Sequence, residues 1–170
     1  MTAGAEHTDV LALCRGMPLR QMAAGQVLLE EGRSAGVLYV LATGAVEIVK
    51  GEVQITTVSE PGSVFGEVSI LLETPHMATV RTLQDSTFYV AEHPLDFLRS
   101  QPELALSVCR LLARRLQFVT TYLVDLKRQF AGHDDHFALV DEVLENLVHH
   151  QAAPSKIGSD RCPESDMDEH

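Results

Sequence analysis

Glycines recur at short intervals between residues 25 and 66 and separate short runs of β-branched and apolar residues. Glycine adopts positive φ without steric cost, so it is favoured at tight corners between strands. Short strands separated by turn residues every 8–12 positions predict an antiparallel barrel or sandwich. The runs that we expect to form strands are residues 26–30, 37–42, 45–50, 53–58, 78–82 and 86–91.

The length and composition are those of a globular chain with one main domain. The chain has 170 residues, of which 45% are hydrophobic and 22% charged, enough for one core of ordinary size. Its apolar runs are too short to cross a bilayer, and the N-terminus lacks a basic segment followed by an apolar stretch, so we expect a cytoplasmic protein. Three widely spaced cysteines predict neither a zinc site nor a disulfide framework.

Residues 65–81, FGEVSILLETPHMATVR, are the most informative stretch for function. A glycine and a carboxylate, Gly66 and Glu67, open a short apolar turn, and the chain returns to a strand through Pro75. A helix that starts in this way offers free backbone N–H groups to an anion, with a carboxylate beside them to accept from a hydroxyl. The combination suits a sugar phosphate.

This stretch resembles the phosphate-binding cassette of the cyclic nucleotide-binding domain family. Residues 28–32 and 36–48 are also similar to strands of that family's β-roll, so the resemblance covers about residues 19–130. It implies an α+β fold: an antiparallel, jelly-roll-like β-roll with a short cassette helix and long C-terminal helices. It also implies a non-enzymatic regulatory module that senses a ligand.

The resemblance further implies roles for individual residues. In the family, the glutamate of the Gly-Glu pair, here Glu67, accepts from the ribose 2′-hydroxyl, and an arginine after the proline pairs with the phosphate. This chain has His76 at the arginine position, and Met77 where a small residue usually helps to hold the phosphate. Thr120 and Thr121 lie where the family closes over the purine, and they either contact the base or are solvated helix residues. The candidate ligand-binding residues are Gly66, Glu67, Val68, Pro75, His76, Met77, Ala78, Thr120 and Thr121, with cyclic AMP or cyclic GMP as the ligand and no cofactor or metal expected.

His76 weakens the phosphate side of this site. Neutral imidazole offers one donor and no full charge near pH 7, whereas guanidinium offers a planar pair of donors. Loss of such a charge-assisted pair costs about 1.5–3 kcal/mol, or about one to two decades in affinity. Arg81 does not replace the arginine, because the odd spacing from His76 places it on the opposite face of a strand. If His76 contacts the phosphate, affinity should rise as the pH falls from about 8 to about 6.

A long helix is predicted after Pro102. Apolar residues recur at alternating intervals of four and three from Ala105 to Phe130. This period is typical of a coiled-coil seam, although a helix that packs on its own domain shows a similar stripe. We expect the first half to pack on the β-roll and the second half to need a partner. A homodimer is favoured, with Leu116, Val119, Leu123, Leu126 and Phe130 at its interface.

The remaining segments complete the domain prediction. Residues 1–18 are expected to form an N-terminal segment with a short helix that ends near Pro18, and residues 19–130 the domain with its long helix. Residues 131–150 should form one extra helix after a solvated turn, HDDH, at residues 133–136. Residues 151–170 have a net charge of −3 with two prolines and predict a disordered acidic tail. This leaves no room for a recognition helix, and the net charge of −11 provides no basic face, so we expect no DNA partner and no membrane partner.

Three functions remain open from the sequence. The first is a dimeric cyclic nucleotide sensor that signals through its C-terminal helices to an unknown protein partner. The second is a degenerate member of the fold that acts as a protein-interaction or scaffold domain, or binds another ligand. A transcription regulator is the weakest of the three. No nucleophile–base pair, metal motif or phosphate-transfer loop indicates an enzyme.

Overall fold

The computed structural model describes residues 10–129, 140, 143 and 144, which fall into two compact units divided after Arg114. Residues 10–13 are helical and precede eight strands and three longer helices. The strands are β1 (Leu19–Met22), β2 (Val27–Leu29), β3 (Leu38–Thr43), β4 (Val46–Lys50), β5 (Val53–Val58), β6 (Val64–Phe65), β7 (Thr79–Thr82) and β8 (Ser86–Ala91), and the helices are α2 (Glu67–Leu72), α3 (Pro94–Ser100) and α4 (Pro102–Gln129).

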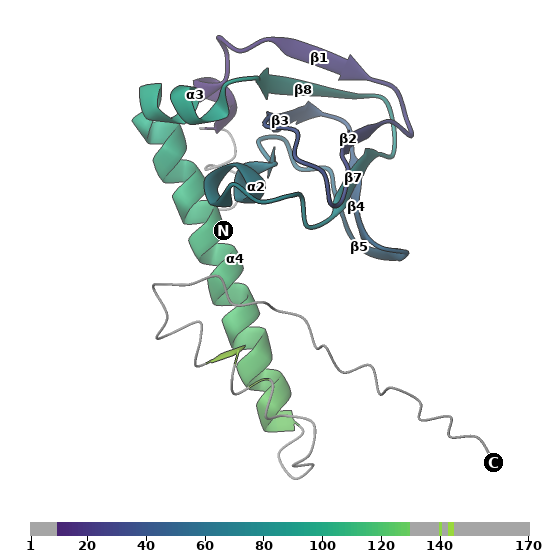
Figure 1. Ribbon diagram of the computed structural model, residues 1–170, viewed down its shortest axis with the longest axis vertical. Helices are drawn as coiled ribbons and strands as arrows, with labels where there is room; N and C mark the ends of the chain where they lie inside the picture. Colours follow the sequence, from purple (N-terminus) through teal and green to yellow (C-terminus); the bar gives the residue numbers. More distant parts are fainter. Residues whose placement is uncertain (1–9, 130–139, 141–142, 145–170) are drawn as a thin grey trace, which may run out of the picture. The chain divides into compact units, whose positions relative to one another are not determined.

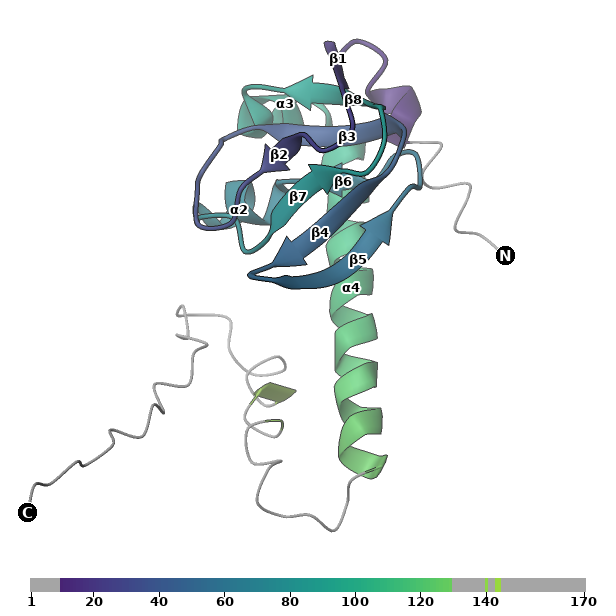
Figure 2. The same cartoon turned by 90° about the vertical axis from the view of Figure 1, so that its right-hand side faces the viewer.

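The strands of the first unit form two four-stranded antiparallel sheets (Figures 1 and 2). One sheet has the order β1-β8-β3-β6 and the other the order β2-β7-β4-β5. In each sheet, strands from the beginning and the end of the domain are neighbours. This arrangement confirms the expected α+β architecture, an antiparallel β-roll with a short cassette helix and a long helix after it.

Strand β3 explains how the core is divided. Its first four residues, LYVL, are all buried, and their side chains alternate between the two faces of the sheet. Leu38 and Val40 belong to one apolar cluster. Tyr39 and Leu41 belong to the other, in which the rings of Tyr39 and Phe88 meet edge to face at 6.0 Å. A continuous apolar run is therefore needed at this strand, because both of its faces are covered.

The start of α4 packs against the first of these clusters. Leu104 and Val108 are buried there, and Ala105 and Leu112 pack against them in part. Cys109, by contrast, is exposed. The prediction that the first half of the helix packs on the β-roll is thus confirmed, but the buried face is centred on Leu104 and Val108, beside the four-three stripe rather than on it.

The six predicted strands agree with the structure to within one residue at each end, and two strands were missed. Strand β1 was not among the predicted strands, although it pairs with β8 from Leu19 onward. The N-terminal helix, expected to end near Pro18, stops at residue 13. Strand β6 has two residues, too few for a sequence pattern.

Cys14 is fully buried, and burial raises the pKa of its thiol to about 11.

The second unit contains the C-terminal half of α4, and Val140, Val143 and Leu144 are also helical. Phe130, most of the extra helix predicted for residues 131–150 and the tail predicted for residues 151–170 lie outside the described residues. Among the residues that the structure describes, no helix is long and apolar enough to span a membrane.

Candidate functional site

The cassette begins where strand β6 turns into helix α2. Gly66 makes this turn with φ of 94°, in the left-handed region that favours glycine. A Cβ atom at this position would lie 2.7 Å from the carbonyl oxygen of Val37. Both the backbone conformation and the close approach of the Val37 carbonyl therefore require glycine here, independently of any ligand.

Glu67 is the first residue of α2 and is buried, with 3% of its surface exposed. A carboxylate in the first helical turn is stabilised by the positive end of the helix dipole. The Ser69 hydroxyl donates to the Gly66 carbonyl at 3.3 Å, and Val68 is half-buried. The Gly-Glu pair thus has the backbone geometry that the cassette pattern predicts, at the edge of the packed interior.

His76 is also buried, with 5% of its surface exposed, and its imidazole is already in use. Its Nε2 atom accepts a hydrogen bond from the backbone N–H of Ala35 at 3.1 Å. Two backbone bonds support this contact: Gly32 N–H donates to the His76 carbonyl at 2.9 Å, and His76 N–H donates to the Arg33 carbonyl at 2.8 Å. Three hydrogen bonds therefore tie the loop between β2 and β3 to this one residue.

An imidazole nitrogen that accepts from an N–H group carries no proton, so His76 is neutral with its proton on Nδ1. Burial lowers the pKa of His76 below its ordinary value of 6.5, because the charged form is poorly solvated there. The histidine at the arginine position consequently supplies no positive charge to the cassette at neutral pH.

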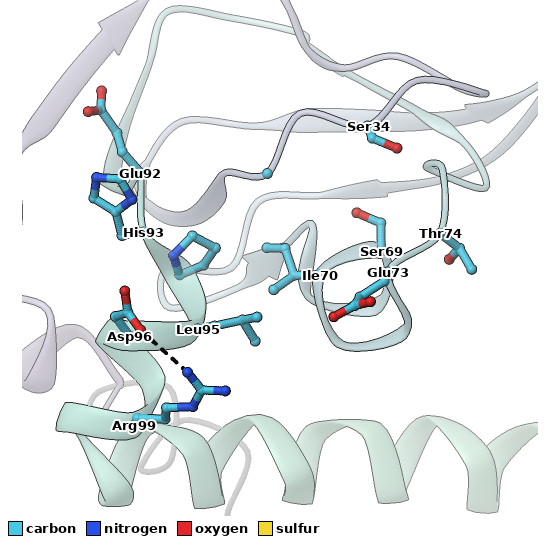
Figure 3. A pocket seen from close by; sticks show the side chains of 12 residues that line it. Ser34, Ser69, Ile70, Glu73, Thr74, Glu92, His93, Leu95, Asp96 and Arg99 are labelled. Carbon is cyan, nitrogen blue, oxygen red and sulfur yellow. Dashed lines mark hydrogen bonds and ion pairs between the residues drawn. The ribbon is translucent and has the colours of Figure 1, made fainter.

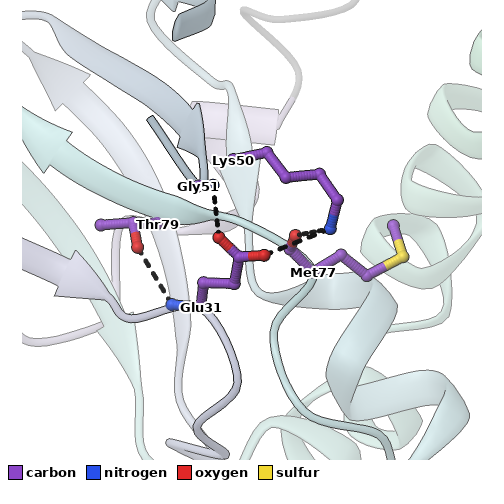
Figure 4. Close-up of polar contacts among 5 residues, drawn as sticks. All are labelled: Glu31, Lys50, Gly51, Met77 and Thr79. Atoms are coloured by element: carbon purple, nitrogen blue, oxygen red, sulfur yellow. Dashed lines mark hydrogen bonds and ion pairs between the residues drawn. The ribbon is translucent and has the colours of Figure 1, made fainter. Parts of the chain in front are cut away.

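The chain leaves the cassette through Met77 and Ala78. The Met77 side chain is 63% exposed, whereas Ala78 is half-buried and Pro75 is exposed. Lys50, at the end of β4, donates from Nζ to the Met77 carbonyl at 2.7 Å and to Glu31 at 3.3 Å (Figure 4). Sequence analysis missed this contact, because Lys50 and Met77 are 27 positions apart and no pattern connects them.

Glu31 completes the connection between the hairpin and the cassette. Its second carboxylate oxygen accepts from Gly51 N–H at 2.8 Å, and its own N–H donates to the Thr79 hydroxyl at 3.0 Å (Figure 4). The Gly51 hydrogen bond, followed by the bond to Lys50, lowers the pKa of Glu31 below 4.5. The carboxylate is therefore charged at neutral pH and neutralises Lys50.

The other cations beside the cassette are paired in the same way. Arg33, whose carbonyl receives the His76 N–H, forms an ion pair with Glu30 at 2.8 Å. Arg81 on β7 donates from Nε to Glu47 on β4 at 2.7 Å. Each of the three cations next to residues 75–81 of the β-roll thus has its own carboxylate.

Thr120 and Thr121 lie on α4, in the second unit. The Thr120 hydroxyl donates to the carbonyl of Leu116 at 2.8 Å, within the same helix, and Thr121 is exposed. Among the candidate dimer residues, Leu116 and Val119 are exposed, whereas Leu123 and Leu126 are half-buried.

A pocket of about 450 Å³ lies on another side of the cassette helix (Figure 3). Ser69, Ile70 and Glu73 of the α2 segment face Leu95 and Arg99 of α3 across it. Arg99 is held by Asp96 at 3.4 Å. Neither Glu67 nor His76 lines this pocket, although Ser69, Ile70, Glu73 and Thr74 of the cassette segment do. Among the described residues, no group of three or more histidine, cysteine or acidic side chains is placed to hold a metal ion, and residues 133–136 lie outside that set.

The two antiparallel sheets form a β-roll. The cassette, which begins at Gly66, lies between β6 and β7, and helices α3 and α4 follow the last strand. Residues 19–95 match the family described as cyclic nucleotide-binding domain. The matched residues include the cassette, so the resemblance that its motif predicted is confirmed.

Three similar proteins illustrate the match. The chain is 37% identical over 68 residues to an uncharacterized ABC transporter ATP-binding protein of Mycobacterium tuberculosis, covering 38% of this chain and 21% of the relative. It is 28% identical over 131 residues to a CRP-like cAMP-activated global transcriptional regulator of the same organism, covering 72% and 58%. The crystal structure of the Thermus thermophilus catabolite activator protein shares the fold, with a TM-score of 0.55 at 24% identity, covering 86% of this chain and 82% of that one. The chain therefore spans about a fifth of the length of the first relative and less than two thirds of the second.

Proposed function

We propose that this chain is a non-enzymatic regulatory module that senses a ligand of the cyclic nucleotide type. The observation that carries the proposal is the turn at Gly66, which brings the buried carboxylate of Glu67 to the start of α2. A carboxylate at this position accepts from a ribose hydroxyl, a hydrogen bond to a charged group worth about 1.5–3 kcal/mol. Sugar recognition is the part of the cassette that this chain retains.

The phosphate side of the proposed site is weak. His76 is neutral and accepts from Ala35, so it offers no charge to a phosphate. We infer that binding of cyclic AMP or cyclic GMP is weaker than in a cassette with arginine, by about one to two decades.

We further propose that the module signals as a homodimer through α4. The stripe of Leu116, Val119, Leu123 and Leu126 lies further along α4 than Leu104 and Val108, which pack on the β-roll. Pairing two such stripes would remove exposed apolar surface from water. A shift of these helices on ligand binding would then be transmitted to a protein partner.

A second candidate function is a protein-interaction or scaffold domain that no longer binds a nucleotide. The observation in its favour is that His76 makes hydrogen bonds inside the protein: its Nε2 atom accepts from Ala35, and its backbone pairs with Gly32 and Arg33. With these contacts, His76 contributes to the stability of the fold without any ligand.

Isothermal titration calorimetry with cyclic AMP and cyclic GMP separates the two functions. The native chain should bind at least one of them weakly, and His76→Arg should bind it about tenfold or more tightly, because guanidinium restores a charged donor pair. His93→Arg is the matched control, since it adds the same charge at an exposed position outside the cassette. Absence of binding in both the native chain and His76→Arg would leave the scaffold function.

A further inference from the structure

We propose that the pocket between α2 and α3 binds a small organic cation, a molecule with an apolar body and one amine group. This site differs from the proposed cyclic nucleotide site, because neither Glu67 nor His76 lines it. It therefore does not depend on that function. Three observations carry the proposal: the size and lining of the pocket, the balance of charges around it, and the backbone conformation of Glu73.

The pocket has the size and the lining of a small-molecule site. Its volume of about 450 Å³ lies within the range of about 300–1,000 Å³ that is usual for such sites. Ile70 of α2 and Leu95 of α3 supply apolar surface, and Ser34 and Thr74 line it further out with their hydroxyl groups (Figure 3). A ligand with an apolar body therefore finds hydrophobic contacts there together with a few hydrogen-bond partners.

The charges that line the pocket leave one carboxylate without a partner. Asp96 is paired with Arg99 at 3.4 Å, and Glu92 with Arg20 at 3.6 Å. Within the described part of the chain, no residue forms a hydrogen bond or an ion pair with the Glu73 carboxylate. A cation fits this balance, because it pairs with Glu73 without breaking an existing ion pair, whereas an anion is repelled.

The backbone conformation of Glu73 is not explained by the fold alone. Glu73 ends α2 with φ of 53°, and it is the only non-glycine residue with a positive φ in the part of the chain that the structure describes. Glycine is the usual residue at such a helix end, because any side chain is strained there. The Glu73 side chain is exposed and makes no internal contact that would offset this strain. Strained residues of this kind cluster at ligand sites, which agrees with the place of Glu73 in the lining of the pocket (Figure 3).

The test is a titration of the full chain with phenethylamine, followed by the NMR signals of the Ile70 and Leu95 methyl groups. A pH of about 8 is chosen because imidazole is ordinarily uncharged there and an alkylamine is charged. The matched probes are 2-phenylethanol, which is neutral, and 3-phenylpropanoate, which is negative. We expect phenethylamine to shift both methyl signals and to bind about fivefold more tightly than either matched probe. Equal affinity for 2-phenylethanol would overturn the proposal. So would the absence of a shift with phenethylamine up to about 20 mM, a range that covers the affinity expected of so small a ligand.

Two variants of Glu73 test its role in the site. Glu73→Gln should weaken phenethylamine binding about fivefold and leave the binding of 2-phenylethanol unchanged. Glu52→Gln is the matched control, since it removes an exposed carboxylate outside the pocket and should change neither affinity. Glu73→Gly should lose the same affinity but unfold at a Tm about 2–4 °C higher, because glycine removes the backbone strain. Unchanged phenethylamine affinity in Glu73→Gln would overturn the proposal, and a lower Tm for Glu73→Gly would do the same, because the side chain would then stabilise the fold.

Discussion

A single position, residue 76, illustrates how the same cassette backbone can hold different chemistry. The β-roll places this residue beside the loop that joins β2 to β3, and the backbone bonds to Gly32 and Arg33 do not depend on the side chain. What the histidine adds is a third bond, from Ala35 N–H to its imidazole. The His76 side chain therefore takes part in a hydrogen bond within the protein itself.

The first prediction concerns the pH dependence of stability. Burial lowers the pKa of His76 in the folded chain, whereas in the unfolded chain it stays near 6.5. The unfolded state then binds more protons below that pH, so His76 contributes stability that is present above about pH 6.5 and is lost as the pH falls below it. Urea unfolding between pH 7.5 and pH 5.0 should show a steeper loss of the free energy of unfolding for the native chain than for His76→Gln. Identical slopes would contradict the prediction.

The second prediction concerns Gly66. Gly66→Ala should destabilise the chain by roughly 1–2 kcal/mol from its left-handed backbone conformation alone, and overlap with the Val37 carbonyl adds to this cost. Gly16→Ala is the matched control, because nothing lies within 4 Å of a Cβ built there and its φ is not positive. Thermal unfolding should give a lower Tm for Gly66→Ala only. A native-like Tm for this variant would contradict the close approach of the Val37 carbonyl.

At the scale of elements, the cassette depends on the hairpin formed by β4 and β5. Lys50 and Gly51 lie at the tip of this hairpin, and both contact Glu31, which follows β2. The link reaches the cassette through the Met77 carbonyl (Figure 4). Three segments that are distant in the sequence are therefore connected around one carboxylate.

The third prediction tests this connection. Glu31→Ala removes the acceptor of Gly51 N–H, so hydrogen exchange measured by NMR should become faster at Gly51 and at residues 77–79, which lose the support of Lys50. Because the Gly51 bond and Lys50 lower the pKa of Glu31 below 4.5, the native protection should persist at pH 5. Glu30→Ala is the control: its carboxylate pairs with Arg33, so Gly51 should keep its protection. Unchanged exchange at Gly51 in Glu31→Ala would exclude the contact.

At the scale of the whole molecule, α4 carries apolar residues beyond those that pack on the β-roll. Leu104 and Val108 are buried against the β-roll, whereas Leu116 and Val119, further along, are 48% and 46% exposed. Helix residues four and three positions apart share a face. The apolar stripe therefore continues along α4 beyond Leu112, past the part of the helix that packs against the β-roll core.

The fourth prediction is that Leu123→Glu weakens the homodimer. A charge at the centre of the stripe would be buried at the interface without a partner, so the dimer should dissociate, while the β-roll keeps its fold. Gln117→Glu is the control, since it adds the same charge at an exposed position off the stripe. Analytical ultracentrifugation at micromolar concentration should show a dimer for the native chain and Gln117→Glu, and a monomer for Leu123→Glu. A monomeric native chain would refute the homodimer.

Local signals explain which parts of the fold were predictable. Strands β5 and β8 were predicted with their observed bounds, because each is a short β-branched or apolar run next to turn residues. The family and the position of the cassette followed from Gly66, Glu67 and Pro75, which are close together in the sequence. Strand β6 was missed because its two residues have no period of their own; its pairing with β3 creates it.

The sequence by itself determined the β-roll and its cassette, because alternating apolar runs, glycine corners and the Gly-Glu pair are local properties of the chain. The tertiary structure decided the chemistry of the cassette. The partner of the His76 imidazole is Ala35, 41 positions away, and Lys50 reaches Met77 across 27 positions. Hydrogen bonds and ion pairs at such separations depend on which strands lie side by side, and no spacing in the sequence encodes them. The resemblance placed His76 at the position of a phosphate ligand, whereas in the folded chain its imidazole accepts a hydrogen bond from the backbone.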